Sequence, residues 1–212
     1  MKQARRLAVA GLVATLLLAG CGPQAQGEND AQIIENEQET VYIFPDGTQV
    51  RGEEARWMKQ TLARLYPPER MNGRRMVNEE AVRSALGEQV VQFTHPATPS
   101  RFHFVGYTLA EINGIVSVSA YWGSPASKEW IAINVQKMDG QTQHFTSPIC
   151  EDWSESEGSK AIDVPPGGNY GCFAEVIVPG WYVHLWMKNV PETDAISIAS
   201  SVRDKVFSIT TQ

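Results

Sequence analysis

The fold is decided by a β-prone stretch in the C-terminal half of the chain, FAEVIVPGWYVHLWM at residues 173–187. Residues 173–178 and 181–187 are rich in β-branched and aromatic side chains, which favour strands. Between them, Pro179 presets φ and Gly180 tolerates a positive φ, so this pair predicts a turn. The stretch therefore predicts two strands joined by Pro179-Gly180.

Further strand patterns precede this stretch. The periodicity becomes strand-like at residues 90–93, and β-prone runs follow at 102–107, 115–122 and 130–136. Asp139-Gly140 is a strong hairpin signal, which predicts that the run at 130–136 leads directly into a paired strand at 141–146. In total the sequence predicts five or six strands.

Helical spacing appears at three places. Residues 52–65 carry apolar side chains at steps of three and four, and Pro67-Pro68 ends the pattern. After a basic loop at 69–75, which we expect to be exposed, Asn78 predicts the N-cap of a second, shorter helix that Gly87 would end. Residues from Asp194 to Phe207 predict a terminal helix. The fold class expected is α+β, with a largely antiparallel sheet, two early helices and a C-terminal helix.

The N-terminus has the pattern of a bacterial lipoprotein signal. Three basic residues precede an apolar run at 7–18, which is too short to span a bilayer comfortably but suits an export signal. Leu18-Ala19-Gly20-Cys21 matches the lipobox, so cleavage before Cys21 and its acylation are expected, with stable anchoring by more than one acyl chain. A plain secretory signal is the alternative. Gly22 stands where an aspartate would favour inner-membrane retention, so we expect the outer membrane, facing the periplasm.

The remaining chain divides into a tether and a domain. Residues 21–40 are polar and acidic, which predicts a flexible tether, and 41–212 form the periplasmic α+β domain, with a candidate sub-boundary near 95–100. Removal of residues 1–20 takes away three basic residues and no acidic ones, so the net charge goes from −6 to −9. Such a chain repels nucleic acid, which is therefore excluded as a partner.

Two cysteines remain when Cys21 carries lipid. Cys150 and Cys172 form an even pair in an oxidising compartment, which predicts a disulfide. Two thiols that bind a metal or perform redox chemistry are the alternative, although neither cysteine lies in a Cys-x-x-Cys pair. The loop at 155–166 between them is polar and expected to be solvated.

The residues around these cysteines form the most distinctive motif of the chain. Cys150 is followed by Asp152, Trp153 and Ser154, and Cys172 is preceded by Asn169, Tyr170 and Gly171. This motif resembles that of the CpaD-type lipoproteins of tight-adherence (Tad, or Flp) pilus assembly, which the lipobox and the chain length also match. The resemblance implies an outer-membrane lipoprotein that supports the pilus secretin through binding surfaces, with the motif residues as candidate contacts. The close match covers about a tenth of the mature chain, and residues 173–178 depart from the family pattern.

No motif supports an enzyme. The histidines, His95, His103, His144 and His184, have no metal-ligand spacing, and no nucleophile elbow or phosphate loop occurs. Glu151 and Asp152 are adjacent carboxylates in a polar segment, where solvation is the usual state. We therefore expect no catalytic residue, no metal and no cofactor.

Aromatic residues are dense in the strand region and leave a second binding function open. Tyr121-Trp122 and Trp181-Tyr182 are adjacent pairs, and each pair should split between the two faces of a sheet, with at least half of the rings in the core. Exposed rings would suit a protein interface. The alternative is an envelope lipoprotein that binds peptidoglycan or another polysaccharide through such rings.

Overall fold

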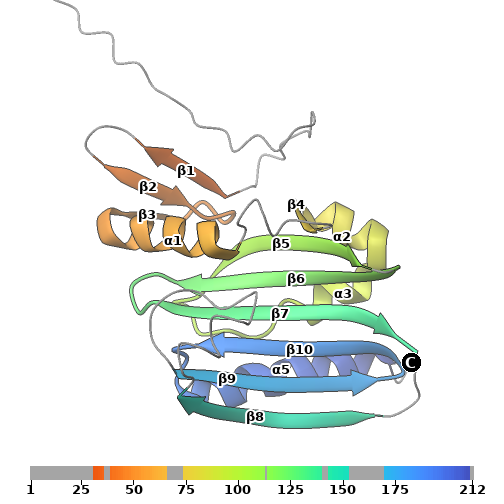
Figure 1. Cartoon of the computed structure of the whole chain (residues 1–212). Helices are drawn as coiled ribbons and strands as arrows, with labels where there is room; N and C mark the ends of the chain where they lie inside the picture. The colour runs from red at the N-terminus through yellow and green to blue at the C-terminus, as the bar shows by residue number, and fades with distance from the viewer. Residues whose placement is uncertain are drawn as a thin grey trace, which may run out of the picture.

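The structure, a computed structural model, describes residues 31–35, 39–65, 74–112, 114–139, 143–152 and 170–210. Figure 1 shows a broad twisted sheet with helices on both sides and a small strand-and-helix unit at one end. The seven-stranded sheet has the order β4-β5-β6-β7-β10-β9-β8, and every neighbouring pair is antiparallel. Its strands are β4 (Arg74–Val77), β5 (His103–Ile112), β6 (Ile115–Ser124), β7 (Glu129–Met138), β8 (His144–Asp152), β9 (Tyr170–Val178) and β10 (Gly180–Lys188).

The predicted turn at Pro179-Gly180 is confirmed. Trp181 pairs with Val178, so Pro179 and Gly180 form a two-residue connection between β9 and β10, and Gly180 has a φ of 85°. Proline at the first and glycine at the second central position, with a positive φ at the glycine, match a type II turn. The stretch that decided the fold is therefore a hairpin.

The hairpin predicted at Asp139-Gly140 does not form. β7 pairs with β6 and β10, whereas β8 lies at the far edge and pairs with β9. The four-strand order β7-β10-β9-β8 is that of a Greek key. β10 takes the place beside β7 because its buried side chains Val183 and Leu185 stand opposite Val135 and Ile133 of β7, which forms a continuous apolar centre.

Three helices cover one side of this sheet. They are α2 (Glu79–Leu86), α3 (Glu88–Phe93) and the terminal α5 (Glu192–Thr210). The oxygen of the Asn78 side chain accepts a hydrogen bond from the backbone N–H of Ala81 (3.0 Å), and Gly87 ends α2 with a φ of 97°. Both predicted boundaries of the second helix are thus confirmed.

Two local expectations were wrong on this side of the molecule. Residues 90–93 form the end of α3 and not a strand, because Val90, Val91 and Phe93 are all buried in one helical turn against the core. Tertiary burial here outweighs the β propensity of valine. Of the basic loop expected at 69–75, residues 69–73 lie outside the described residues, and Arg74 and Arg75 belong to β4, which pairs with β5 along the sheet edge.

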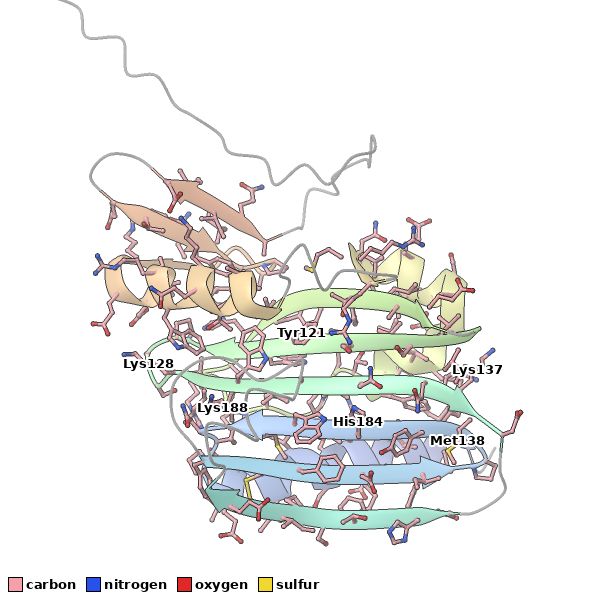
Figure 2. The ribbon with its side chains drawn as sticks, in the orientation of Figure 1. Tyr121, Lys128, Lys137, Met138, His184 and Lys188 are labelled. Carbon is pink, nitrogen blue, oxygen red and sulfur yellow. A yellow bond between two sulfur atoms is a disulfide. The ribbon has the colours of Figure 1, made fainter. Side chains whose placement is uncertain are left out.

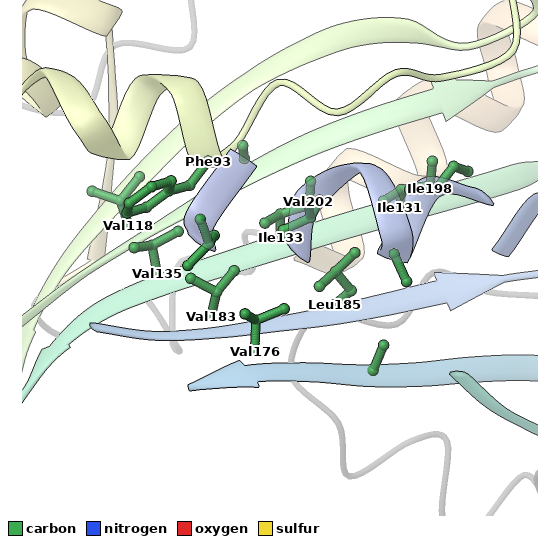
Figure 3. Packing of buried hydrophobic residues seen from close by; sticks show 14 of the residues in the cluster. Phe93, Val118, Ile131, Ile133, Val135, Val176, Val183, Leu185, Ile198 and Val202 are labelled. Carbon is green, nitrogen blue, oxygen red and sulfur yellow. The ribbon is translucent and has the colours of Figure 1, made fainter. Parts of the chain in front are cut away.

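The main core lies between α5, α3 and the sheet (Figure 3). Apolar side chains alternate along β6, β7, β9 and β10, so each strand contributes every second residue to this layer. In Figure 3, Ile198 and Val202 of α5 point toward Ile133 and Leu185 of the central strands. This helix-side cluster contains 27 buried residues of the described chain.

A smaller N-terminal unit covers part of the other side. It consists of β1 (Gln32–Glu35), β2 (Thr40–Ile43) and β3 (Gln49–Arg51), in that order, and α1 (Gly52–Leu65), whose bounds agree with the expected helix. Tyr42, Phe44 and Met58 pack on Tyr121 and Trp130 of the large sheet. This N-terminal cluster contains nine buried residues.

The position of β1 changes the boundary of the expected tether. β1 lies within residues 21–40, yet Ile33 pairs with Tyr42 and Ile34 with Val41. Gln32–Glu35 is thus a strand and not part of a flexible tether, because the only adjacent apolar residues of the segment add a strand to β2. Residues 21–30 and 36–38, including Cys21, lie outside the described residues.

Both buried clusters contain residues from before and after the candidate sub-boundary at 95–100, so the structure places no division of the core there. The fold class is α+β with a largely antiparallel sheet, as expected, and α3 adds a third early helix. Within the described part of the chain, no helix is long and apolar enough to cross a membrane.

Candidate functional site

The predicted disulfide is present. Cys150 of β8 and Cys172 of β9 are direct cross-strand partners, with a sequence separation of 22 and a Cα–Cα distance of 4.1 Å. Cys172 is fully buried in the helix-side cluster, and Cys150 packs against the same cluster. The bridge therefore fastens the edge strand β8 to the core of the sheet.

Of the other motif residues, only some belong to the described part of the chain. Asp152 ends β8 opposite Tyr170, and Gly171 stands opposite Glu151. Tyr170 is partly buried and packs against the helix-side cluster, while its backbone carbonyl accepts the N–H of Asn189 (3.0 Å). Trp153, Ser154 and Asn169, like Cys21 and the loop at 155–166, lie outside the described residues. The described part of the motif belongs to strands β8 and β9, where the disulfide and the backbone pairing link the two strands.

The four histidines lie at separate places in the fold. His95 contacts Tyr107 on the helix side, His103 pairs with Asp46, His144 bonds to Thr146 on the edge strand, and His184 lies on β10. Among the residues that the structure describes, no three His, Cys, Asp or Glu side chains form a group that could hold a metal ion.

The aromatic pairs split between the faces of the sheet, as alternation predicted. Tyr121 is buried in the N-terminal cluster and Trp122 packs against the helix-side cluster, and Trp181 is buried on the helix side while Tyr182 is partly exposed on the other. Tyr121, Trp130 and Trp181 are core residues. At least half of the rings in question therefore serve packing, as expected.

The remaining aromatics form a surface on the side of the sheet opposite α5. We call it the β9–β10 face. Its members are partly exposed, alternate with buried residues, and come from two adjacent strands: Phe173, Glu175 and Ile177 of β9, and Tyr182, His184 and Trp186 of β10. In Figure 2, His184 lies on this side of β10, below Tyr121 of β6.

The rings of the β9–β10 face form a continuous row of contacts. The ring centroids of Phe173 and Trp186 are 4.8 Å apart, and His184 lies 6.2 Å from Trp186 and 5.3 Å from Tyr182. The planes of His184 and its two strand neighbours are nearly perpendicular, at 83° and 85°. Edge-to-face contacts of this kind are favourable and hold the rings in fixed positions.

A carboxylate lies in the middle of these rings. Glu175 is the direct cross-strand partner of His184, and its Oε1 accepts a hydrogen bond from the hydroxyl of Tyr182 (2.5 Å). Burial raises the pKa of Tyr182 above its usual value, and the hydrogen bond to Glu175 and the negative charge of that carboxylate raise it further. The tyrosine therefore stays protonated and acts as a hydrogen-bond donor at neutral pH.

Polar side chains of β7 and β6 lie beside the β9–β10 face. Asn134 stands opposite His184 on β7, and its amide donates to the hydroxyl of Ser119 (2.9 Å). Gln136, opposite Tyr182, is partly exposed. Asn134 and Ser119 are buried, so Gln136 is the member of this group that the surface presents beside its aromatic centre.

A shallow cavity of about 440 Å³ lies on the helix side, between α3 and α5. Its charged groups already have partners, because the ammonium of Lys205 donates to the carbonyl of His95 and the carboxylate of Glu79 pairs with Arg83. Because its charged groups are already paired within the protein, the cavity is a weaker candidate for a binding site than the β9–β10 face.

Sequence reasoning named Tyr182 but missed Phe173, Glu175 and Ile177 as its neighbours on one surface. Part of the signal was present in the alternation of the two strands, where Phe173 and Glu175, and likewise Tyr182, His184 and Trp186, alternate with aliphatic residues. Comparison of the chain with protein-family models, with curated proteins and with solved structures finds no match.

Proposed function

We propose that the protein is a non-catalytic, lipid-anchored envelope protein that binds another protein through the β9–β10 face. The observation that carries this proposal is the grouping of the partly exposed Phe173, Ile177 and Tyr182 on the side of the sheet opposite α5. Partly exposed tyrosine and tryptophan side chains are common anchors of protein interfaces. Rigid strands hold them in place, which lowers the entropic cost of binding.

The proposed setting is Tad/Flp-type pilus assembly. The resemblance of the cysteine motif to CpaD-type lipoproteins supports a role as an accessory factor of the pilus secretin at the outer membrane. In this account the lipid on Cys21 fixes the domain at the membrane, and the β9–β10 face contacts the partner on the periplasmic side. Binding is the whole mechanism, so no catalytic residue and no cofactor are required.

Polysaccharide binding is the competing function, and the partly exposed amide of Gln136 beside the aromatic rings favours it. However, sugars stack on flat aromatic surfaces, and the rings of Tyr182, His184 and Trp186 meet nearly at right angles. This arrangement suits the irregular surface of a protein better than a row of sugar rings.

The test is a crosslinked pull-down of the tagged, lipidated protein from its native membranes, followed by mass spectrometry. We expect enrichment of a secretin and other pilus-assembly proteins, which is lost in Cys21→Ala and in the double variant Ile177→Ala/Tyr182→Ala. Ile196→Ala on α5 is the matched control, because Ile196 is 46% exposed on the opposite side. Recovery of peptidoglycan fragments alone, or of the same proteins with every variant, would contradict the proposal.

A further inference from the structure

Glu175 is a partly buried carboxylate without a counter-ion among the described residues. It forms no ion pair there, and its hydrogen-bond partner is the neutral hydroxyl of Tyr182. Two other acids that are shielded from solvent differ in this respect: the buried Glu129 and the half-buried Asp194 both pair with Arg101. A carboxylate that has lost part of its hydration is stabilised by a cation, and here the described chain supplies none.

The surroundings of Glu175 are those that favour a cation from outside. His184 stands directly across from it, Tyr182 lies diagonally, and Phe173 precedes it by two residues on the same side of β9. Aromatic faces attract cations, and the attraction increases when the site is partly dehydrated. Because Tyr182 occupies one position on Oε1, the carboxylate keeps Oε2 for a further donor.

We infer that this point of the β9–β10 face receives an arginine side chain of the partner protein, an inference that rests on the proposed function. The guanidinium would pair with the Glu175 carboxylate and lie against the rings of Tyr182 and Phe173. Arginine fits better than lysine, because its planar group stacks on aromatic rings while its N–H groups bind a carboxylate. The net charge of −6 for the whole chain also attracts a basic partner surface.

The experiment uses the full mature protein in detergent micelles and an acetylated, amidated tetra-arginine peptide as the probe. Amide chemical shifts report the place of binding, and their titration reports the affinity. A tetra-citrulline peptide, which has the same shape without the charge, and a tetra-lysine peptide are the ligand controls. We expect the largest shifts at β9 and β10, weaker binding of tetra-lysine, and no binding of tetra-citrulline.

Two isosteric variants test whether the Glu175 carboxylate binds the peptide. Glu175→Gln should weaken tetra-arginine binding about tenfold, the factor expected for one charge-assisted hydrogen bond. Glu111→Gln, which removes an exposed charge from β5, should leave it unchanged. Equal thermal unfolding of both variants excludes a folding defect. Tetra-arginine binding that is equal in Glu175→Gln and wild type, or shifts spread over other acidic positions, would overturn the inference.

The same variants separate this inference from the proposed function. A secretin captured equally by wild type and Glu175→Gln, but lost with Ile177→Ala/Tyr182→Ala, would overturn the arginine assignment and support protein binding. Failure of the wild type to capture any pilus-assembly protein would overturn the proposed function without changing the peptide result.

Discussion

The two buried clusters on either side of the large sheet differ in size and in how well their polar atoms are satisfied. The helix-side cluster has 27 buried residues, and its buried Thr94 hydroxyl bonds to the carbonyls of Val90 and Val91. The N-terminal cluster has nine, and three buried polar atoms in or beside it have no hydrogen-bond partner among the described residues: the Tyr42 and Thr61 hydroxyls and the Trp130 indole N–H. Each such atom costs about 1–3 kcal/mol. The helix side therefore holds the fold, and the N-terminal unit should open at a lower free energy.

The largest effect should come from a cavity in the helix-side cluster. Leu185→Ala removes a fully buried side chain from the centre of the sheet and should lower the free energy of unfolding by about 2–5 kcal/mol. Met58→Ala in the N-terminal cluster should mainly increase hydrogen exchange in α1 and leave the global transition nearly unchanged. Denaturant unfolding and native-state hydrogen exchange measure the two effects. Equal losses of global stability would show that the clusters unfold as one unit.

Removal of the disulfide should also act on the helix side. The double variant Cys150→Ala/Cys172→Ala should lose about 3 kcal/mol, the value of the chain-entropy estimate for a loop of this length. Thermal unfolding of the variant and of the reduced wild type gives the measurement. Hydrogen exchange in α1 should stay as in the wild type below the global transition. An unchanged melting temperature would contradict this prediction and show that backbone pairing with β9 keeps β8 in the sheet without the disulfide.

Thr61 and Thr94 allow a direct comparison between a buried hydroxyl without a hydrogen-bond partner in the described part of the chain and one with partners. Thr61 and Thr94 are both fully buried, but only Thr94 has hydrogen-bond partners. Thr61→Val should stabilise the protein by about 1 kcal/mol because it removes an unsatisfied hydroxyl, whereas Thr94→Val should destabilise it by about 1 kcal/mol. Chemical denaturation of the two variants tests the prediction, and the same sign for both would refute the distinction.

The smallest expected effect is an opening of the N-terminal unit in acid. Besides the apolar packing, two polar contacts between described residues join this unit to the large sheet and its β6–β7 connection: Asp46 with His103 (3.1 Å) and Glu53 with Lys128 (2.9 Å). Burial would raise the pKa of Asp46, but hydrogen bonds from Thr48 and His103 and the charge of His103 hold it below its usual value. The hydrogen bond and charge of Lys128 likewise lower the pKa of Glu53.

The sign of this pH effect follows from the lowered values. A carboxyl with a lower pKa in the folded state releases its proton more readily there, so its stabilisation is complete above the unfolded pKa of about 4 and is lost as the pH falls. Hydrogen exchange in α1 should therefore rise relative to β10 below about pH 4. Asp46→Asn should remove part of this difference, and an α1 to β10 ratio independent of pH would contradict the account.

The sequence predicted elements better than it predicted their pairing. Local signals placed α1, the caps of α2 and the β9–β10 turn, because each depends on neighbouring residues such as Asn78 or Gly180. The Asp139-Gly140 signal failed because the partner of β7 is chosen by burial against β10, some 40 residues away, which no local pattern contains. Likewise, Val90 and Val91 have β propensity, and only packing against the core makes them helical.

The candidate site was predictable only in part. The disulfide followed from the cysteine count and the expected oxidising compartment, and the division of Tyr121 from Trp122 followed from strand alternation. Glu175 could not be recognised, because its neighbourhood depends on the register that sets it opposite His184. Residues from two strands can be assigned to one surface only when the register between the strands is known.

The most direct test of the proposed function is photo-crosslinking from the β9–β10 face in native membranes. A photoreactive phenylalanine analogue replaces Ile177 in the lipidated protein, and the same analogue replaces Ile196 on α5 as the control. The account predicts that position 177, and not position 196, crosslinks to a secretin or another pilus-assembly protein. Equal adducts from both positions, or adducts with glycan alone at position 177, would contradict it.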